Sequence, residues 1–354
     1  MVTPRFFAKH EGSLRCLLCP SRCIIPAGNS GHCGVRFNHE GKGNIPFYGF
    51  VSALAQDPIE KKPLYHFRPG TQILSVGFTG CNMHCPFCQN WSISQTTDVS
   101  GKVYSPAEII AAAAGSIAYT YSEPLVHVEF LLDCMKLARK AGIANVLVSN
   151  GCINADAAEE ILDLCDAANI DLKCFSADTY SNVLGGNLEA VTNFTRTAAA
   201  KNVHLELTTL LVPTLNDSRA ELDKCRDFIA ELETEKGNSI PWHISAYHPD
   251  FKWNRNAKNS PPVTDQNSII AAVKRAREKL PFVYAGNLAL LPAEQNFNDT
   301  LCTYCGKALV RRYGFKADLS SLVQKRENKS AHYSCVFCGE KAAFIKELSP
   351  WSYS

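Results

Sequence analysis

The sequence predicts an α/β protein built on a partial (β/α)6 barrel of the TIM type. From residue 72 to about 285, short apolar runs alternate with amphipathic segments of helical periodicity. This alternation is typical of a parallel sheet covered by helices. The repeated units span roughly 210 residues, whereas a closed eight-unit barrel usually needs about 250. We therefore expect an open barrel with fewer units.

Each barrel element has its own local signal. The first strand is predicted at 73–78, where the apolar run ILSVGF lies between Gly70 and Gly80. Ser105 followed by Pro106 predicts the start of the first helix, because proline is favoured at the first helical position. The later elements alternate in the same way, with strands expected at 116–121, 145–149, 169–173, 203–211, 240–245 and 282–284, and helices at 126–141, 155–168, 187–201, 217–236 and 265–279.

Cysteine-rich stretches flank the barrel on both sides. The chain has 354 residues, enough for one large domain with small appendages, and 16 of them are cysteines. We expect an N-terminal cysteine-rich segment at 1–70, the barrel at 71–290 and a zinc-ribbon-like segment at 291–354.

Composition excludes several classes of protein. The net charge is only +2, so no global charge favours nucleic acid or a membrane surface. The start, MVTPRFF, lacks the apolar run of a signal peptide, and the Ala-rich run at 109–118 is too short to span a bilayer. We expect a cytoplasmic protein whose cysteines bind metal rather than form disulfides.

The most specific motif is the C-x3-C-x2-C triad of Cys81, Cys85 and Cys88, with Phe87 before the third cysteine. Three thiolates leave one iron of a [4Fe–4S] cube without a protein ligand, and the amino and carboxylate groups of S-adenosylmethionine can chelate it. One electron passed to the bound sulfonium then releases a 5′-deoxyadenosyl radical. The alternatives are a zinc loop or three unconnected thiols. The triad follows the first predicted strand, on the face where barrels place their chemistry.

Polar residues also follow the other predicted strands. Carboxyl ends of parallel strands share one rim, so these side chains should converge beside the triad. We expect them to form one binding pocket, with Tyr121, Ser122 and Glu123 after the second strand, Asn150 after the third, Asp171 and Lys173 at the fourth, and His243 in the sixth. For His243, a satisfied core histidine is the alternative. Cys152 and Cys174 follow two of these sets and are expected to be either buried or reactive thiols.

Two further cysteine groups predict metal sites near the termini. Cys302, Cys305, Cys335 and Cys338 form two C-x2-C-Gly knuckles, which suit one structural zinc or iron ion. The N-terminal group has the spacing C-x2-C-x3-C-x9-C and suits either a structural metal or an auxiliary [4Fe–4S] cluster; it comprises Cys16, Cys19, Cys23 and Cys33. His32 or His10 could replace Cys33 as its fourth ligand.

Over almost its full length the chain resembles the radical S-adenosylmethionine enzyme of the AmmeMemoRadiSam group, close kin of the pyruvate formate-lyase activating enzymes. The segments that carry the resemblance are CLLCPSRCIIPAGNSGHCGVR at 16–36, DPIEKKPLYHF at 57–67, TYSEP at 120–124, DLK at 171–173, LTTLLVP at 207–213 and WHIS at 242–245. The resemblance implies a barrel of the radical SAM type that holds an iron–sulfur cluster and S-adenosyl-L-methionine.

The resemblance also implies roles for individual residues. Phe87 would pack near the adenine of the cofactor and His243 near its adenosine. Glu123 would face the cofactor's amino group, at the end of a segment where the activating enzymes carry Gly-Gly-Glu; the two glycines are absent here. Lys173, in the Asp-Leu-Lys segment, suits the cofactor's carboxylate as a point charge.

An oxidoreductase of the glycyl-radical-activase type is therefore the leading hypothesis. It implies an electron donor such as flavodoxin or ferredoxin, a protein or peptide substrate, and a partner of the Memo or AMMECR1 type. The second hypothesis is radical-based RNA modification, because the C-terminal segment has a local charge of +5: Lys307, Arg311, Arg312, Lys316, Lys325, Arg326 and Lys329 against Asp318 and Glu327. A nonenzymatic metal-binding scaffold is the third.

Overall fold

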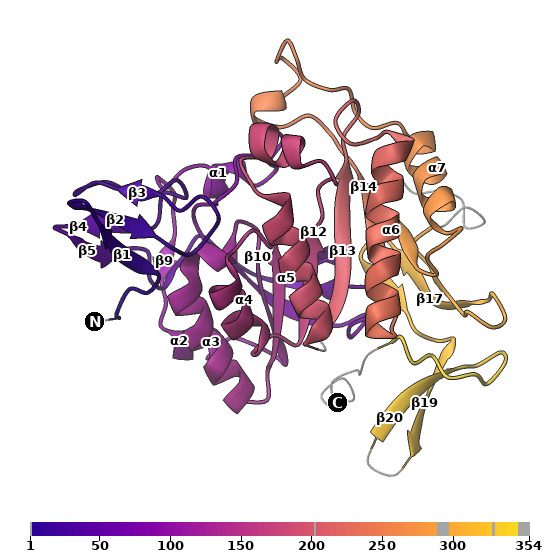
Figure 1. The fold of residues 1–354 in the computed structure, drawn as a ribbon. Helices are drawn as coiled ribbons and strands as arrows, with labels where there is room; N and C mark the ends of the chain where they lie inside the picture. Colours follow the sequence, from indigo (N-terminus) through magenta and orange to yellow (C-terminus); the bar gives the residue numbers. More distant parts are fainter. Residues whose placement is uncertain (1, 202, 289–296, 328–329, 346–354) are drawn as a thin grey trace.

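The computed structural model describes residues 2–201, 203–288, 297–327 and 330–345 (Figure 1). Its centre is one eight-stranded sheet in the order β15-β14-β13-β12-β11-β10-β8-β7. All neighbours from β8 to β15 pair in parallel, and β7 is an antiparallel edge strand. The strands are β7 (Ala53–Pro58), β8 (Gln72–Gly77), β10 (Ser116–Thr120), β11 (Ala144–Ser149), β12 (Ala167–Asp171), β13 (His204–Leu211), β14 (Trp242–Ala246) and β15 (Val283–Gly286).

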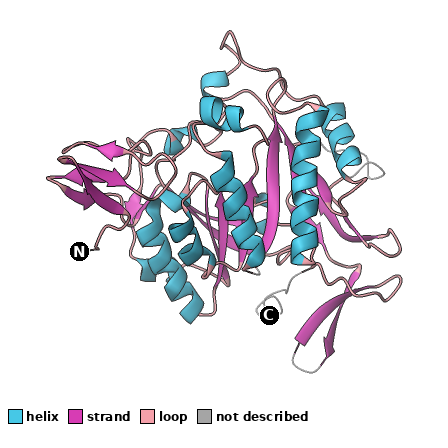
Figure 2. Cartoon of the chain, in the orientation of Figure 1, coloured by secondary structure: helices cyan, strands magenta, loops and turns pink. Residues whose placement is uncertain are grey.

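Amphipathic helices cover the outer face of this sheet (Figure 2). Their starts are fixed by side-chain caps: Ser105 and Glu108 form a capping box at α2, and Ser218 caps α6. The helices are α1 (Trp91–Ser94), α2 (Pro106–Ala111), α3 (Val128–Lys140), α4 (Ala155–Leu162), α5 (Leu188–Ala200), α6 (Arg219–Lys236) and α7 (Gln266–Ala276), with shorter turns at η1 (Ile59–Lys61), η2 (Pro124–His127), η3 (Thr179–Leu184) and η4 (Phe251–Trp253).

The barrel matches the expected α/β architecture, with two differences. A strand that the sequence did not predict, β7, adds to the sheet from inside the segment assigned to the N-terminal region. The helix predicted at 155–168 ends at Leu162, because β12 already begins at Ala167 and the chain must turn between them.

The segment that follows β7 closes the lower end of the barrel. Ile59, Leu64 and Phe67 pack with the first residues of the strands, including Ile73 and Ala167, in a small apolar cluster. Because β7 runs antiparallel to β8, this segment, residues 59–67, lies at the amino ends of the parallel strands. The carboxyl ends of the parallel strands form the opposite end, which this segment does not cover and which is called the free end of the barrel.

One buried carboxylate joins this lower segment to the strands. Glu206 on β13 is fully buried and accepts hydrogen bonds from the backbone amides of Tyr65 and His66, at 2.9 and 2.8 Å. Its oxygens also contact the Nε2 atoms of His204 and His243, at 2.9 and 2.7 Å. These contacts hold the pKa of Glu206 well below its usual range although burial alone would raise it.

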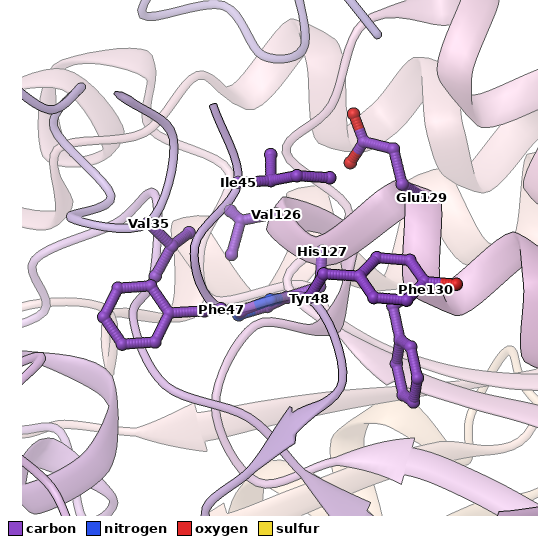
Figure 3. Close-up of a pocket in the computed structure, with 8 residues that line it drawn as sticks. All are labelled: Val35, Ile45, Phe47, Tyr48, Val126, His127, Glu129 and Phe130. Carbon is purple, nitrogen blue, oxygen red and sulfur yellow. The ribbon is translucent and has the colours of Figure 1, made fainter. Parts of the chain in front are cut away.

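The N-terminal segment packs against the side of the barrel (Figure 1). Arg36 forms an ion pair with Glu129 of α3 at 2.9 Å, with both side chains almost fully buried. A pocket at this seam, drawn in Figure 3, has a free volume of about 10 Å³, which is only enough for about one water. The segment's strands are β1 (Phe7–His10), β2 (Ser13–Cys16), β3 (Ile24–Ile25), β4 (Phe37–His39), β5 (Lys42–Asn44) and β6 (Phe50–Val51), and β6 pairs with β9 (Lys102–Val103).

The C-terminal segment has a small core of its own. It includes Leu309, Val310 and Tyr333. Arg312 of this segment donates to the carbonyl of Tyr65 at 2.7 Å and so joins it to the lower end of the barrel. The strands are β16 (Thr300–Leu301), β17 (Ala308–Tyr313), β18 (Lys316–Asp318), β19 (Leu322–Glu327) and β20 (Ser330–Cys335).

Replacing Glu206 tests whether this carboxylate stabilises the fold. Glu206→Ala leaves several buried donors without an acceptor, and each costs about 1–3 kcal/mol. We expect the thermal unfolding midpoint to fall by roughly 5–10 °C in a melting experiment. Glu235→Ala, at an exposed ion pair with Arg196, is the control and should change stability by less than about 0.5 kcal/mol. Equal shifts in the two variants would contradict the assignment.

Candidate functional site

The cysteine triad lies on the loop that leaves the carboxyl end of β8. Cys81, Cys85 and Cys88 are buried or half-buried and form no disulfide. Backbone hydrogen bonds hold this loop at two points, from His84 N to Leu184 O at 2.8 Å and from Trp253 N to Pro86 O at 3.0 Å. The loop is therefore shaped by the chain around it and does not depend on side-chain packing alone.

Polar groups reach two of the triad sulfurs. Cys81 Sγ accepts from the Met83 amide at 3.3 Å and lies 3.7 Å from Asn150 Nδ2. Cys88 Sγ lies 3.2 Å from the Ser94 hydroxyl. Burial, followed by the charge of Glu123, raises the pKa of Cys81 well above its usual value, so a positive group is needed to keep this thiol ionised. Donors aimed at sulfur, together with a buried thiol that needs a cation, fit an iron–sulfur cluster.

Asp171 and Lys173 lie within electrostatic reach of Cys85 of the triad. Lys173 Nζ contacts Asp171 Oδ2 at 2.9 Å, and both side chains keep part of their surface exposed. Burial lowers the pKa of Lys173, but the charges of Asp171 and Cys85 outweigh it and raise that pKa above its usual value. A permanent cation therefore lies near Cys85, with a carboxylate next to it.

Glu123 has a different environment from the one expected of a cofactor ligand. It is almost fully buried, and its oxygens accept from the Leu125 amide at 3.0 Å, the Ser149 hydroxyl at 2.7 Å and the Asn150 amide at 2.9 Å. Burial raises its pKa to about 7 despite these bonds. In this structure the carboxylate joins the loops after β10 and β11.

Asn150 and Ser122 flank that carboxylate. The Asn150 side chain donates to Asn82 Oδ1 at 3.0 Å and accepts from the Cys152 amide at 2.8 Å, so it braces the triad loop. Ser122 Oγ is buried and has no hydrogen-bond partner among the described residues. This hydroxyl is the free polar group of the Tyr-Ser-Glu segment.

Tyr121 belongs to a polar set on the inner face of the barrel that sequence analysis missed. Its backbone is left-handed, with φ of +70°, and its hydroxyl donates to Asp57. Asp57 also pairs with the buried Lys62 at 2.7 Å, and Lys62 Nζ lies 4.2 Å from the centre of the Tyr121 ring. Gly77 makes room for this ring, because a Cβ there would lie 2.8 Å from Tyr121 Cδ2. The string DPIEKKPLYHF contained the signal, as two lysines close to one aspartate.

Phe87 lies in an aromatic group at the free end of the barrel. Its ring is 5.6 Å from that of Trp253 and 6.2 Å from that of Tyr247. Both partners come from the chain that follows β14, so this chain lies over the triad loop. Aromatic faces of this kind are suited to a flat heterocycle such as adenine.

His243 does not join the rim residues. It is almost fully buried, contacts Glu206, and lies edge-on to Tyr65 at 4.6 Å between ring centres. This environment favours the alternative reading, a satisfied core histidine. Cys152 and Cys174 are also buried, and burial raises their pKa to about 12 and about 11, which makes them poor nucleophiles.

The C-terminal knuckles come together as one site. The sulfurs of Cys302 and Cys338 lie 3.7 Å apart and those of Cys305 and Cys335 lie 3.8 Å apart. All four lie within 4.8 Å of one another. A tetrahedral ion with bonds of about 2.3 Å to sulfur needs sulfurs about 3.8 Å apart, so the group fits a single ion.

The N-terminal cysteines are arranged more loosely. Burial, with further contributions from the charges of Cys19 and Cys16, raises the pKa of Cys33 to about 12, so these thiols lie within electrostatic reach of one another. Among the described residues, the C-terminal group is the only set of three or more metal-ligating side chains gathered within 4.8 Å. Within those residues, neither the triad nor the N-terminal group is gathered as closely as the C-terminal group.

None of the helices in the described ranges is both long and apolar enough to cross a membrane.

Comparison with known proteins gives a consistent result. Residues 75–229 match the Radical SAM superfamily. An uncharacterized protein of Methanocaldococcus jannaschii is 36% identical over 341 residues, which cover 95% of this chain and 96% of that protein. The pyruvate formate-lyase 1-activating enzyme of Escherichia coli K12 is 24% identical over 196 residues, 52% of this chain and 78% of that enzyme.

A solved domain of a pyruvate-formate lyase-activating enzyme from Bacteroides vulgatus aligns with a TM-score of 0.42 at 17% identity, over 49% of this chain and 100% of that domain. The relative from Methanocaldococcus jannaschii extends the likeness beyond the barrel to nearly the whole sequence. The chain belongs to the Radical SAM superfamily and is related to the pyruvate formate-lyase activating enzymes.

Proposed function

We propose that this protein cleaves S-adenosylmethionine reductively and uses the resulting 5′-deoxyadenosyl radical on a substrate. The observation that carries the proposal is the triad loop, in which three cysteines lie at the free end of a parallel barrel beside a charged lysine. A [4Fe–4S] cluster on Cys81, Cys85 and Cys88 would supply the electron and the open iron for the cofactor.

The protein's own groups would bind and orient the cofactor. Lys173 carries the positive charge that suits a carboxylate, and Asp171 beside it suits an ammonium group. Phe87 and Trp253 provide ring faces for the adenine. For Glu123 we propose an indirect role, in which it holds the Asn150 loop in place and leaves Ser122 Oγ for a direct contact.

For the substrate we propose a protein or peptide, as in the related activating enzymes. A glycyl-radical-activase-like oxidoreductase needs a one-electron donor such as flavodoxin or ferredoxin, and the resemblance adds a partner of the Memo or AMMECR1 type. Sixteen free thiols and an iron–sulfur centre suit a reducing, cytoplasmic setting.

RNA modification is less well supported. Arg312, one of the basic residues that suggested it, is buried and donates to Tyr65 O and to Thr300 Oγ1 at 2.7 and 2.8 Å, so it is not available to a phosphate. Lys329, another of them, lies outside the described residues.

For the C-terminal group we propose zinc. Four thiolates at tetrahedral separations leave no position for a substrate, which is typical of a structural site. The segment has only a small core, so the ion would contribute directly to its folding.

Lys173→Met tests the cofactor pocket. It removes a charged contact worth about 1.5–3 kcal/mol, and we expect S-adenosylmethionine to bind roughly 10- to 100-fold more weakly to the reconstituted protein, measured by titration. Iron content should not change. Lys279→Met is the control, because Lys279 also pairs with an aspartate, Asp227, at 3.0 Å but lies on the α7 side. Equal cofactor affinity in the unmodified protein and in both variants would argue against this pocket.

Cys335→Ser tests the C-terminal site. We expect the variant to lose one zinc per chain in elemental analysis, and the segment from 297 onward to become sensitive to limited proteolysis, because its small core no longer has a metal to hold it. Reductive cofactor cleavage by the barrel should continue. A folded variant that keeps its zinc, or that loses cleavage, would show that the site is misassigned.

A further inference from the structure

The N-terminal cysteines are brought together by the backbone. β2 pairs with β3 in antiparallel register, and the hydrogen bond from Cys16 N to Cys23 O at 2.9 Å extends this pairing, so the two cysteines lie opposite each other. The chain between them closes into a tight turn, with Arg22 N donating to Cys19 O at 3.1 Å. Three of the four thiols therefore belong to one small loop.

Cys33 reaches this loop through its neighbours. A Cβ on Gly31 would lie 3.6 Å from Cys23 Sγ, and the His32 amide donates to the same sulfur at 3.3 Å. An amide donor on a cysteine sulfur is also present in the triad, from Met83 to Cys81. The chain just before Cys33 therefore contacts Cys23, and Cys33 itself lies within electrostatic reach of Cys16 and Cys19.

The chain around Cys33 lies directly against the triad loop. The carbonyl oxygen of Cys33 is so close to Gly80 that a Cβ at residue 80 would lie 2.5 Å from it. Cys33 and Cys81 also line one cavity of about 170 Å³ together with His32 and His84. On its other side the loop is held by Asn154, whose amide and side chain donate to Leu18 O and Leu17 O at 3.0 and 2.8 Å.

Close packing of the sulfurs separates the C-terminal cysteine group from the other two among the described residues. At the C-terminus all four lie within 4.8 Å of one another, as a single ion requires. In a cubane each thiolate binds a different iron, so the thiolates are farther apart than those that share one ion. In the described residues, both the triad and the N-terminal group lack the tight gathering.

The N-terminal segment also has little need of a metal for folding. Leu18 and Ile25 belong to the main core of the barrel, and the buried Arg36–Glu129 pair fixes the chain just after Cys33. The C-terminal segment, in contrast, has a separate small core.

We propose that Cys16, Cys19, Cys23 and Cys33 bind a second [4Fe–4S] cluster that passes electrons to the cluster on Cys81, Cys85 and Cys88. Four thiolates cover every iron, which leaves no open iron for S-adenosylmethionine and makes electron transfer the suitable role.

The electrons balance over one turnover. A one-electron donor protein of the flavodoxin class is oxidised by one electron, the N-terminal site gains that electron and loses it again to the triad site, and the sulfonium is reduced as its carbon–sulfur bond breaks. This transfer role rests on the function proposed above, whereas the presence of the second cluster does not.

Metal analysis of the anaerobically reconstituted full-length protein tests the second cluster. We expect about eight irons, about eight sulfides and about one zinc per chain. Cys19→Ala with Cys23→Ala should remove about four irons, and Cys85→Ala with Cys88→Ala should remove the other four. Cys134→Ala with Cys225→Ala, at buried thiols outside all three groups, is the control and should remove none. About four irons with two zincs in the unmodified protein would overturn the proposal, even if a variant fails to fold.

A measurement of electron delivery tests the role proposed for the second cluster. In the Cys19/Cys23 variant, S-adenosylmethionine should still change the electron paramagnetic resonance signal of the triad cluster, while cofactor cleavage driven by reduced flavodoxin falls at least about ten-fold, or about 1.4 kcal/mol in activation free energy. An unchanged rate with flavodoxin would overturn the relay. If the remaining cluster does not respond to the cofactor, the function proposed above is at fault, and the iron count still decides whether the second cluster exists.

Discussion

The fold depends on the burial of one carboxylate, Glu206. An isolated charge in a protein interior is costly, so every lone pair of this side chain must have a donor. The donors come from the strands themselves, through His204 and His243, and from the segment after β7, through the amides of Tyr65 and His66. Because the carbonyl of Tyr65 accepts from Arg312, the C-terminal segment joins the same network. The lower end of the barrel is thereby closed, and the cysteine triad lies at the opposite end, after the carboxyl end of β8.

The barrel contains two lysine–aspartate pairs that differ in their burial. Lys62 and Asp57 are nearly fully buried, and the aspartate also accepts from Tyr121, so this pair is satisfied within the protein. Lys173 and Asp171 are partly exposed and have fewer partners. A satisfied pair fixes geometry, whereas a partly exposed pair can exchange its contacts with solvent for contacts with a zwitterionic ligand. Tyr121, which follows the second strand of the barrel, has a strained left-handed backbone, and its hydroxyl donates to Asp57 of the buried pair.

Much of the barrel could be predicted from the sequence, because apolar runs and caps mark strands and helices locally. β7 could not, since ALAQDP has little apolar alternation and ends in proline. Motifs could not show the surroundings of each candidate residue: Glu123 is buried by bonds to the loop after β11, and His243 contacts Glu206 and does not join the rim. The spacing of cysteines in the sequence was equally compatible with one ion or a cluster, and only the distances between sulfurs distinguished the C-terminal group from the other two.

The contact between Cys33 and Gly80 is made by main-chain atoms on one side and by the absence of a side chain on the other. No change of rotamer can lengthen such a contact, so the gap between the two cysteine loops does not vary with side-chain motion. Electron transfer between the two proposed clusters would weaken steeply with distance, and a gap set by the backbone would keep that distance constant. A single methyl group at residue 80 would clash with the main chain of Cys33 and push the two loops apart, although it would alter no cysteine side chain. The absence of a side chain at Gly80 therefore sets how closely the two loops can approach each other.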